Sequence, residues 1–437
     1  MISWSSIISN KFNKNTMFML GEKGFTLPLN LLTFLIMARM FGPVDFGLMS
    51  FGLSLVAIFA PFSKLAYETI ITKYLSLGYQ QKSVLRGSVR LRLLGSFVVF
   101  SLLAFTVFLF LEDQVLISFI LAMGATLWVE ALMVQDSLFQ SVLKSKYNTY
   151  ARSTGIVVGS LMRIGVAYYL QDIFLIGLSF ILERLITLLL MQYFASKLNQ
   201  ERTADLGATV TSQKIFLESL PLIMTNIFVL VSFKVDQIFI EYMIGPAEVG
   251  IYASAARFSE VWYILPVIVM STYFPFIAKN ISERVKVEGV LLKISRSLMF
   301  LSIGLIFIVS IGAHFLIENT LGPAFIEAAD VLKIHIITSI FFFAGHPISK
   351  VLIARNKTWI NFSGKLVAAL LNIALNLILI PNWGIQGAAF ATLISYAFGY
   401  YLFYFFYQET RSLAWKITTE PLRSIYSWFG KLLNVSK

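Results

Sequence analysis

The 437-residue chain contains no cysteine, only three histidines and few charged side chains. Without cysteine there can be no disulfides and no thiolate metal sites, and three scattered histidines argue against a histidine-based metal centre. Charged residues make up 13% of the chain and hydrophobic residues 57%, whereas a soluble domain carries about 25% and about 45–50%. The composition therefore indicates a membrane protein.

Long apolar runs are what the sequence has in abundance. A helix needs about 20 mostly apolar residues to cross a bilayer. Residues 1–20 lack the short apolar core and small-residue cleavage site of a signal peptide, so we expect the first span to be retained. The twelve predicted spans are 16–40, 46–66, 90–111, 114–137, 149–170, 173–195, 215–242, 247–274, 296–316, 331–352, 361–380 and 385–408.

Lys and Arg are confined to alternate connections between these spans. The other connections contain neither residue but do contain acids, for example Glu112, Asp113 and Asp172. Because positive charge stays on the cytoplasmic side of a membrane protein, both termini are predicted to be cytoplasmic. Topology thus explains the net charge of +12, and nucleic-acid binding is not expected. The basic connections are 64–92, 138–152, 196–214, 279–296 and 350–365.

One short phrase occurs twice, each time between a pair of predicted spans. Residues 40–50 read "MFGPVDFGLMS" and residues 243–253 read "MIGPAEVGIYA". In the first copy Gly42 ends one helix, Pro43 suits the first turn of the next, and Asp45 lies at that helix's positive end. The phrase therefore predicts a tight external turn, and its second copy falls at the equivalent position six spans later.

The repeat extends beyond this turn, because residues 142–167 align without gaps on residues 351–376 with seven identities. Six spans per copy is an even number, so both copies enter from the cytoplasm and the repeat is parallel. Such repeats are typical of transporters whose substrate site lies between the halves. We therefore expect an all-α membrane protein with two six-helix bundles around a central cavity. The predicted parts are 1–205, 206–409 and a cytoplasmic amphipathic tail, 410–437.

Four segments resemble the polysaccharide flippases of the Wzx type, within the multidrug/oligosaccharidyl-lipid/polysaccharide exporter superfamily. The segments cover both halves of the chain in the family's order. The sequence departs from the family at Thr26, where members often carry a basic residue, and lipid II flippases of the superfamily usually have fourteen spans. The segments are "GEKGFTLPLNLLTFLIMARMFGPVDFGLMSF" (21–51), "VDQIFIEYMIGPAEVGIYASAARFSE" (235–260), "LGPAFIEAADVLKI" (321–334) and "IPNWGIQGAAFATLISYAFGY" (380–400).

The resemblance implies a protein of the bacterial inner membrane that moves an undecaprenyl-diphosphate-linked oligosaccharide from the cytoplasmic to the outer leaflet. The oligosaccharide would be a repeat unit of O-antigen, capsule or exopolysaccharide. The resemblance also implies work alongside the polymerase and chain-length proteins of glycan assembly. It implies no enzyme activity, and we expect no catalytic residue, metal or cofactor.

Charged residues inside the predicted spans are the candidate site, because an embedded charge faces a cavity or a partner. Cations there suit a diphosphate, and the arginine fork fits its oxygens. The alternative is local ion pairing: Arg257 and Glu260 share a helix face, whereas Glu183 and Arg184 are sequence neighbours and need partners on other helices. The predicted substrate-binding cations are Lys234, Arg257, Arg163, Arg184, Lys23, Lys64 and Arg39.

Acids inside a transporter also carry protons or accompany ions. Asp236, Glu260 and Glu22 are the candidates for coupling, with a structural salt bridge as the alternative for each. Spans seven and eight carry Lys234 and Arg257 at similar depth, which makes these two cations the first choice for the binding site.

Two other functions remain open from the sequence. A multidrug or small-molecule exporter of the same superfamily would prefer acidic sites for organic cations, but the embedded charges have a basic excess. A membrane polymerase or ligase acting on the same glycan typically needs a large external loop with catalytic residues. The longest external stretch is 314–330, and it contains one histidine and neither Lys nor Arg.

Overall fold

The computed structural model describes residues 11–198 and 208–419, and all regular elements in these ranges are helices. The chain forms two compact units, unit 1 up to Leu230 and unit 2 from Val231 onward. The division falls inside α9 (Ser212–Met243), so this helix contributes its first half to unit 1 and its last half to unit 2. The sequence-repeat boundary between residues 205 and 206 remains a prediction.

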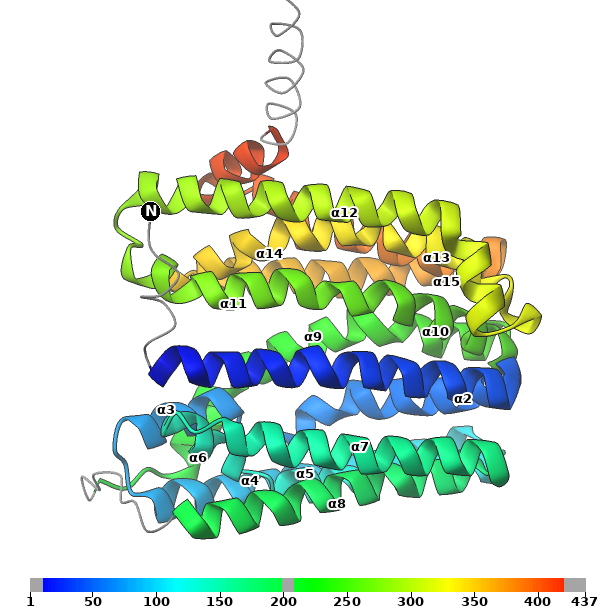
Figure 1. Cartoon of the computed structure of the whole chain (residues 1–437), viewed down its shortest axis with the longest axis horizontal. Helices are drawn as coiled ribbons and strands as arrows, with labels where there is room; N and C mark the ends of the chain where they lie inside the picture. The colour runs from blue at the N-terminus through cyan, green and yellow to red at the C-terminus, as the bar shows by residue number, and fades with distance from the viewer. Residues whose placement is uncertain (1–10, 199–207, 420–437) are drawn as a thin grey trace, which may run out of the picture. The chain divides into compact units, whose positions relative to one another are not determined.

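Unit 1 consists of long helices with two short ones, α3 and α6, at one end (Figure 1). The short helices lie in or beside the basic connections that the sequence placed on the cytoplasmic side. Besides the first half of α9, the helices of unit 1 are α2 (Lys11–Ser63), α3 (Glu68–Ser76), α4 (Gln81–Phe110), α5 (Gln114–Ala131), α6 (Gln135–Ser141), α7 (Lys146–Tyr169) and α8 (Ile173–Leu198).

Unit 2 combines two long helices with shorter helical pieces, some of them separated by 3-10 or π turns. Pro266 lacks the N–H that would donate to the carbonyl of Trp262, and a 3-10 turn lies at this point of the predicted eighth span. The predicted amphipathic tail extends beyond the described residues, which end in a helix over 408–419. The elements are α10 (Pro246–Glu260), η1 (Val261–Tyr263), α11 (Ile264–Lys279), α12 (Arg284–Thr320), η2 (Pro323–Phe325), α13 (Ala328–Ile336), α14 (Thr338–Ala354), α15 (Thr358–Tyr396), a π turn η3 (Ala397–Tyr401) and η4 (Leu402–Phe405).

The repeated Gly-Pro phrase forms the turn that the sequence predicts. Gly42 adopts φ 73° and ψ 177° and divides α2 into two helices, and Gly245 adopts φ 135° directly before Pro246 begins α10. A positive φ is easy only for glycine, and proline fits the first turn of the helix that follows. Gly322, with φ 97° before Pro323, forms a third Gly-Pro turn outside the two copies of the phrase.

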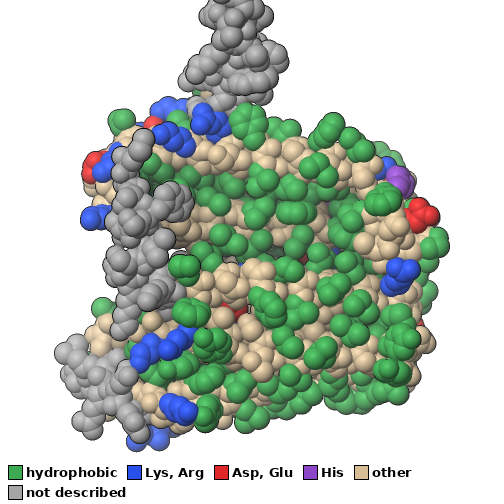
Figure 2. Space-filling model, in the orientation of Figure 1, with side chains coloured by type: hydrophobic (Ala, Val, Ile, Leu, Met, Phe, Trp, Pro, Cys, Tyr) green, Lys and Arg blue, Asp and Glu red, His purple; other side chains and the backbone are tan. Residues whose placement is uncertain are grey.

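The surfaces of both units fit a membrane environment. Figure 2 shows hydrophobic side chains over the long helices and Lys and Arg gathered near helix ends. On α4, Phe105 and Phe108 are 65% and 64% exposed, and Phe315 of α12 is 75% exposed. Large apolar side chains exposed in such numbers are expected to face lipid and not water.

Within the described residues, nine helical runs are long and apolar enough to cross a membrane. Two of these runs each contain a pair of the predicted spans, because the kinks at Gly42 and Gly384 do not break the helical run. The predicted span 149–170 corresponds to α7, which is not among the nine because its polar residues dilute the apolar ones. The chain is therefore a multi-pass membrane protein, and twelve spans in two repeats remain a prediction.

Candidate functional site

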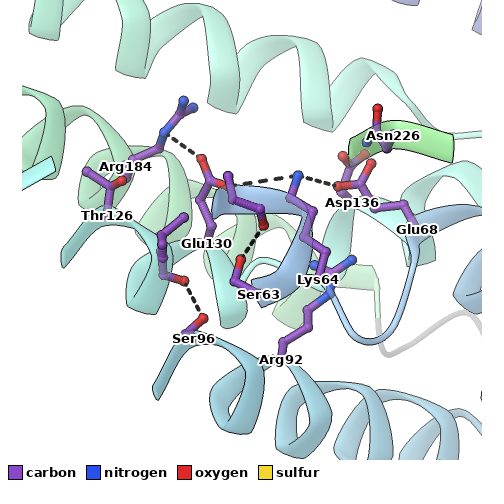
Figure 3. A network of polar contacts seen from close by, with 12 residues as sticks. Ser63, Lys64, Glu68, Arg92, Ser96, Thr126, Glu130, Asp136, Arg184 and Asn226 are labelled. Atoms are coloured by element: carbon purple, nitrogen blue, oxygen red, sulfur yellow. Dashed lines mark hydrogen bonds and ion pairs between the residues drawn. The ribbon is translucent and has the colours of Figure 1, made fainter. Parts of the chain in front are cut away.

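Lys64 follows the end of α2 and contacts two carboxylates from different elements. Its Nζ lies 3.4 Å from Oε1 of Glu68, in the first turn of α3, and 3.8 Å from Oε2 of Glu130, near the end of α5. Figure 3 shows both ion pairs in the surrounding polar network. The ammonium group is thereby placed between two helices of unit 1.

Arg184 of α8 continues this arrangement from the other side of Glu130. Its Nε lies 3.1 Å from Oε1 of Glu130, and one of its terminal nitrogens lies 3.7 Å from Oε1 of Glu183. Lys64 and Arg184 thus hold the two oxygens of a single carboxylate, one cation on each (Figure 3). The loose contact with Glu183 shows that sequence neighbours can approach within ion-pair distance, although they do not share a helix face.

Close packing of α7 on α8 places the next ion pair in the interior of unit 1. Gly155, Gly159 and Arg163 recur every four residues and so share one face of α7. A Cβ at Gly159 would come within 2.8 Å of Glu183, so the absence of a side chain makes room for this acid. Arg163 donates to Oε2 of Glu183 at 2.7 Å, and its guanidinium lies 4.2 Å from the ring centre of Phe180. The interhelical partner that the sequence required for Glu183 is therefore Arg163.

Together these contacts form one continuous ion-pair series in which acids and bases alternate. Its cations differ in exposure: the side chains of Lys64 and Arg184 are each 31% exposed, whereas that of Arg163 is 3% exposed. With three acids and three bases the series has no net charge. In order, its members are Glu68, Lys64, Glu130, Arg184, Glu183 and Arg163.

A second polar cluster of unit 1 was not predicted as a site. Arg152 of α7 contacts the buried Asp136 of α6 at 2.5 Å, and Asn148 also donates to this carboxylate. Gln140 donates to the same acid at 2.9 Å. The sequence signal was present, since Asp136 and Gln140 are spaced i,i+4, but the cluster was divided between a predicted span and a predicted loop.

Two further predicted cations of unit 1 lie on α2, outside the ion-pair series. Lys23 is exposed and lies 3.9 Å from the buried Glu22, while Arg39 is exposed near the Gly42 kink. The candidate coupling acid Glu22 is therefore accompanied by its neighbour in the sequence. Neither cation joins Lys64, Arg163 and Arg184 in the series described above.

In unit 2, Lys234 of α9 pairs with Glu260 of α10 across the two helices. The Nζ to Oε2 distance is 3.4 Å, and both side chains are about one-sixth exposed, at 16% and 15%. Arg257 lies one turn before Glu260 and is exposed. The predicted local partner of Glu260 was Arg257, and the interhelical pair with Lys234 was not foreseen.

Asp236 is a buried carboxylate surrounded by neutral donors. Tyr252 of α10 and Thr392 of α15 donate their hydroxyls to Oδ2, and Asn376 of α15 donates its amide to Oδ1 at 2.6 Å. Asn372 supports Asn376, whose amide also donates to its backbone carbonyl at 2.9 Å. Asp236 was a candidate from sequence, and the two asparagines spaced i,i+4 in an apolar helix were the missed signal.

The ion-pair series of unit 1 and the hydrogen-bonded Asp236 of unit 2 offer different chemistry. Partly exposed Lys64 and Arg184 can donate to an anion with several oxygens, such as a phosphate, because guanidinium and ammonium groups bind phosphates by charge-assisted hydrogen bonds. Asp236 instead offers a negative charge, held by hydroxyl and amide donors, to a proton or a small cation. Among the described residues, groups of three or more His, Cys, Asp or Glu placed to hold a metal ion are absent.

Comparison with solved structures identifies the fold. The chain is similar to the lipid II flippase MurJ in an inward closed conformation, with a TM-score of 0.73 and 16% identity over 96% of this chain and 92% of that one. It is also similar to a multidrug resistance MATE family transporter in an inward-facing conformation, with a TM-score of 0.64 and 12% identity over 93% and 96% of the two chains. These similarities show the fold alone.

A third similar structure is a MOP superfamily transporter from Pyrococcus furiosus, whose binding pocket is described as having reverse polarity. Its TM-score is 0.58, with 11% identity over 94% of this chain and 95% of that one. Comparison with curated protein sequences gives no match. The family model for polysaccharide biosynthesis proteins matches residues 12–281, which is more than half of the chain. The chain therefore belongs to the polysaccharide biosynthesis protein family, as the resemblance in its sequence predicts.

Proposed function

We propose that this protein is a flippase that moves an undecaprenyl-diphosphate-linked oligosaccharide from the inner to the outer leaflet of the bacterial inner membrane by alternating access. The oligosaccharide would be a repeat unit of O-antigen, capsule or exopolysaccharide. Membership of the polysaccharide biosynthesis family and a fold shared with a lipid II flippase support this proposal. Polymerase and chain-length proteins of glycan assembly are the proposed partners.

The observation that carries the proposal is the pair of partly exposed cations on Glu130. An embedded charge costs about 2.5–3.5 kcal/mol on insertion scales, so a membrane protein retains such a charge for a structural or functional reason. For Arg163 the reason is structural, because its side chain is buried and pairs with Glu183. Lys64 and Arg184 are each 31% exposed and can therefore also meet a ligand. We propose the remaining predicted cations, Lys23, Arg39, Lys234 and Arg257, as further contacts along the path of the anionic headgroup.

We also propose that Asp236 couples transport to an ion. Its carboxylate receives three neutral donors, and hydroxyls such as those of Tyr252 and Thr392 can turn from donor to acceptor when a proton or sodium ion binds. Glu260 and Glu22 already accompany Lys234 and Lys23, which favours a structural role for these two acids.

The test is translocation by the purified protein in proteoliposomes. A lipid-linked oligosaccharide with a fluorescent sugar should move between leaflets, as measured by its protection from a membrane-impermeant quencher. A fluorescent organic cation serves as the competing substrate. Movement of the cation without movement of the glycolipid would indicate a multidrug exporter and not a flippase, since a multidrug transporter shares this fold.

The proposed topology has twelve spans with both termini in the cytoplasm. It places Glu112–Asp113 and Ile326 outside and Lys286 inside. Single cysteines at these positions can be placed without interference because the chain has none of its own. An impermeant maleimide added to intact cells should label the first two positions and leave Lys286→Cys unlabelled. The opposite pattern would reverse the orientation.

A further inference from the structure

The geometry of unit 1 points to a role for Glu130 that the proposed function does not include. Glu130 is the one member of the ion-pair series that contacts both partly exposed cations, Lys64 at 3.8 Å and Arg184 at 3.1 Å. One cation lies at each of its two oxygens (Figure 3). A phosphate group would present oxygens to the same two donors. We propose that Glu130 is an internal ligand that occupies an anion site formed by Lys64 and Arg184, and that a diphosphate displaces it.

The charge balance explains why displacement is needed. Within the ion-pair series three acids match three bases, so an incoming diphosphate meets cations that are already paired. If the Glu130 carboxylate moves away, it no longer offsets the positive charge of Lys64 and Arg184. The N–H donors that contacted it are then available to another anion at the same position. Diphosphate then supplies more oxygens than the carboxylate it replaces, and guanidinium and ammonium donors bind such oxygens by charge-assisted hydrogen bonds.

Glu130 is better suited to leave than the other two acids. Glu183 is 7% exposed, is held by Arg163 at 2.7 Å and packs against Gly159, so it has little room to move. Glu68 is more exposed, at 37%, but it contacts Lys64 alone within the series, so its departure would release one cation and not two. Glu130, by contrast, is 24% exposed, and its contact with Lys64 at 3.8 Å is longer than a hydrogen bond.

The position of Glu130 in its helix also favours release. Helix α5 ends at Ala131, so Glu130 lies in the last turn. The last turn carries the negative end of the helix dipole, where a carboxylate is disfavoured and a cation is favoured. Glu130 is therefore held in this position by its two cations, and an anion that competes for those cations frees it from an unfavourable location.

This inference rests on the proposed function only for the identity of the anion, and its test uses a soluble probe. Binding of inorganic pyrophosphate to the full-length protein in lipid nanodiscs is measured by calorimetry for wild type and Glu130→Gln. The glutamine keeps the size of the side chain and removes its charge. We expect the variant to bind pyrophosphate about fivefold to tenfold more tightly, equivalent to loss of one competing ion pair of about 1 kcal/mol.

Two variants show whether the gain comes from this site. Glu130→Gln combined with Lys64→Gln should bind pyrophosphate no more tightly than wild type, because one of the two donors is gone. Glu218→Gln is the matched control, since Glu218 pairs with Lys73 at 2.9 Å in the same unit but away from the ion-pair series. It should leave pyrophosphate binding unchanged. Unchanged or weaker binding by Glu130→Gln would show that Glu130 is a fixed structural partner and overturn the inference.

If Glu130→Gln does not fold, Glu130→Asp provides the measurement. The shorter side chain keeps the charge but reaches both cations less well, so a smaller gain in pyrophosphate affinity is expected, and no gain overturns the inference. A further arm uses undecaprenyl diphosphate in the nanodisc. Competition with pyrophosphate assigns the site to the lipid headgroup, whereas lack of competition assigns it to a free phosphate compound. Tight pyrophosphate binding by Glu130→Gln without glycolipid movement by wild type would remove the proposed function and leave the anion site.

Discussion

In unit 1 the embedded cations alternate with acids along the ion-pair series, whereas in unit 2 the buried acid Asp236 is held by the neutral donors of Tyr252, Thr392 and Asn376. Lys365 of α15, also in unit 2, likewise contacts a neutral group: its Nζ lies 3.1 Å from the centre of the Tyr400 ring. Paired charges can exchange partners while the total charge stays constant. A charge held by neutral groups, by contrast, responds directly to a proton or an ion. We propose that the ion-pair series of unit 1 forms the main site for the anionic substrate and that Asp236 of unit 2 binds the coupling ion.

The largest expected effect is on stability, at the buried end of the ion-pair series. Arg163→Met leaves the carboxylate of Glu183 buried without its main partner, which typically costs about 3–5 kcal/mol. The melting temperature and the amount of protein in the membrane should both fall. Arg163→Met combined with Glu183→Leu should restore much of this loss, because it removes both charges. A double variant as unstable as the single one would mean that Arg163 stabilises unit 1 through packing on Phe180 and not through its charge.

The second effect concerns Asp236 and should appear in coupling and not in stability. In Asp236→Asn the hydroxyls of Tyr252 and Thr392 can still donate to the amide oxygen, and Asn376 can turn its own amide oxygen toward the new NH2 group, so the protein should fold. The response of glycolipid movement to an imposed pH or sodium gradient should fall by about 5- to 150-fold, the range of typical coupling free energies. Transport assays in proteoliposomes with a pH gradient or a sodium gradient measure this response and identify the ion. A full response in the variant would remove the proposed division of roles between the units.

The third effect tests whether the cations of unit 2 also serve the substrate. Lys234→Ala and Arg257→Ala should each reduce glycolipid movement by roughly fivefold, the loss of about 1 kcal/mol, while the protein stays in the membrane at its normal level. Arg257→Lys should recover only part of the activity if the planar fork of arginine matters. Normal transport by the double alanine variant would confine substrate binding to unit 1 and sharpen the contrast between the units.

The smallest effect is expected at an exposed ion pair of unit 1. Lys73 donates to Glu218 at 2.9 Å, and its side chain is 51% exposed. Exposed ion pairs contribute about 0–1 kcal/mol to the free energy of unfolding. Lys73→Ala should therefore change the melting temperature by little and leave transport unchanged. This variant checks that charge removal in unit 1 acts through the ion-pair series. A strong loss of transport by Lys73→Ala would contradict this view.

Much of the fold could be predicted from the sequence because the membrane imposes simple rules. Apolar runs gave the positions of most long helices, and the Gly-Pro phrase gave the turns at Gly42 and Gly245. Short helices α3 and α6 were missed because their mixed composition resembles that of a loop. The 3-10 turn before Pro266 was missed since hydropathy does not report on local hydrogen bonding.

The candidate site residues could be named from the sequence, but their contacts could not. Composition identified Lys64, Arg184 and Asp236 as embedded charges, because each is unusual in an apolar segment. Their partners come from other helices, such as Glu130 of α5 and Asn376 of α15, and pairing between helices depends on packing that a single sequence does not reveal. The i,i+3 rule suggested Arg257 for Glu260, and the interhelical contact of Glu260 with Lys234 was not foreseen.

The division of α9 between the units has an evolutionary consequence. Its first half packs against α3 in unit 1, where Ser219 accepts from the backbone N–H of Tyr67 at 2.9 Å and Asn226 donates to the Tyr67 hydroxyl at 3.1 Å. In the predicted duplication this segment belongs to the second gene copy, so the second copy supplies a helix to the bundle of the first. This one-sided contribution resembles half of a domain swap, fixed within one chain. Fission of the gene at the repeat boundary would therefore yield two polypeptides that need each other to complete the first bundle.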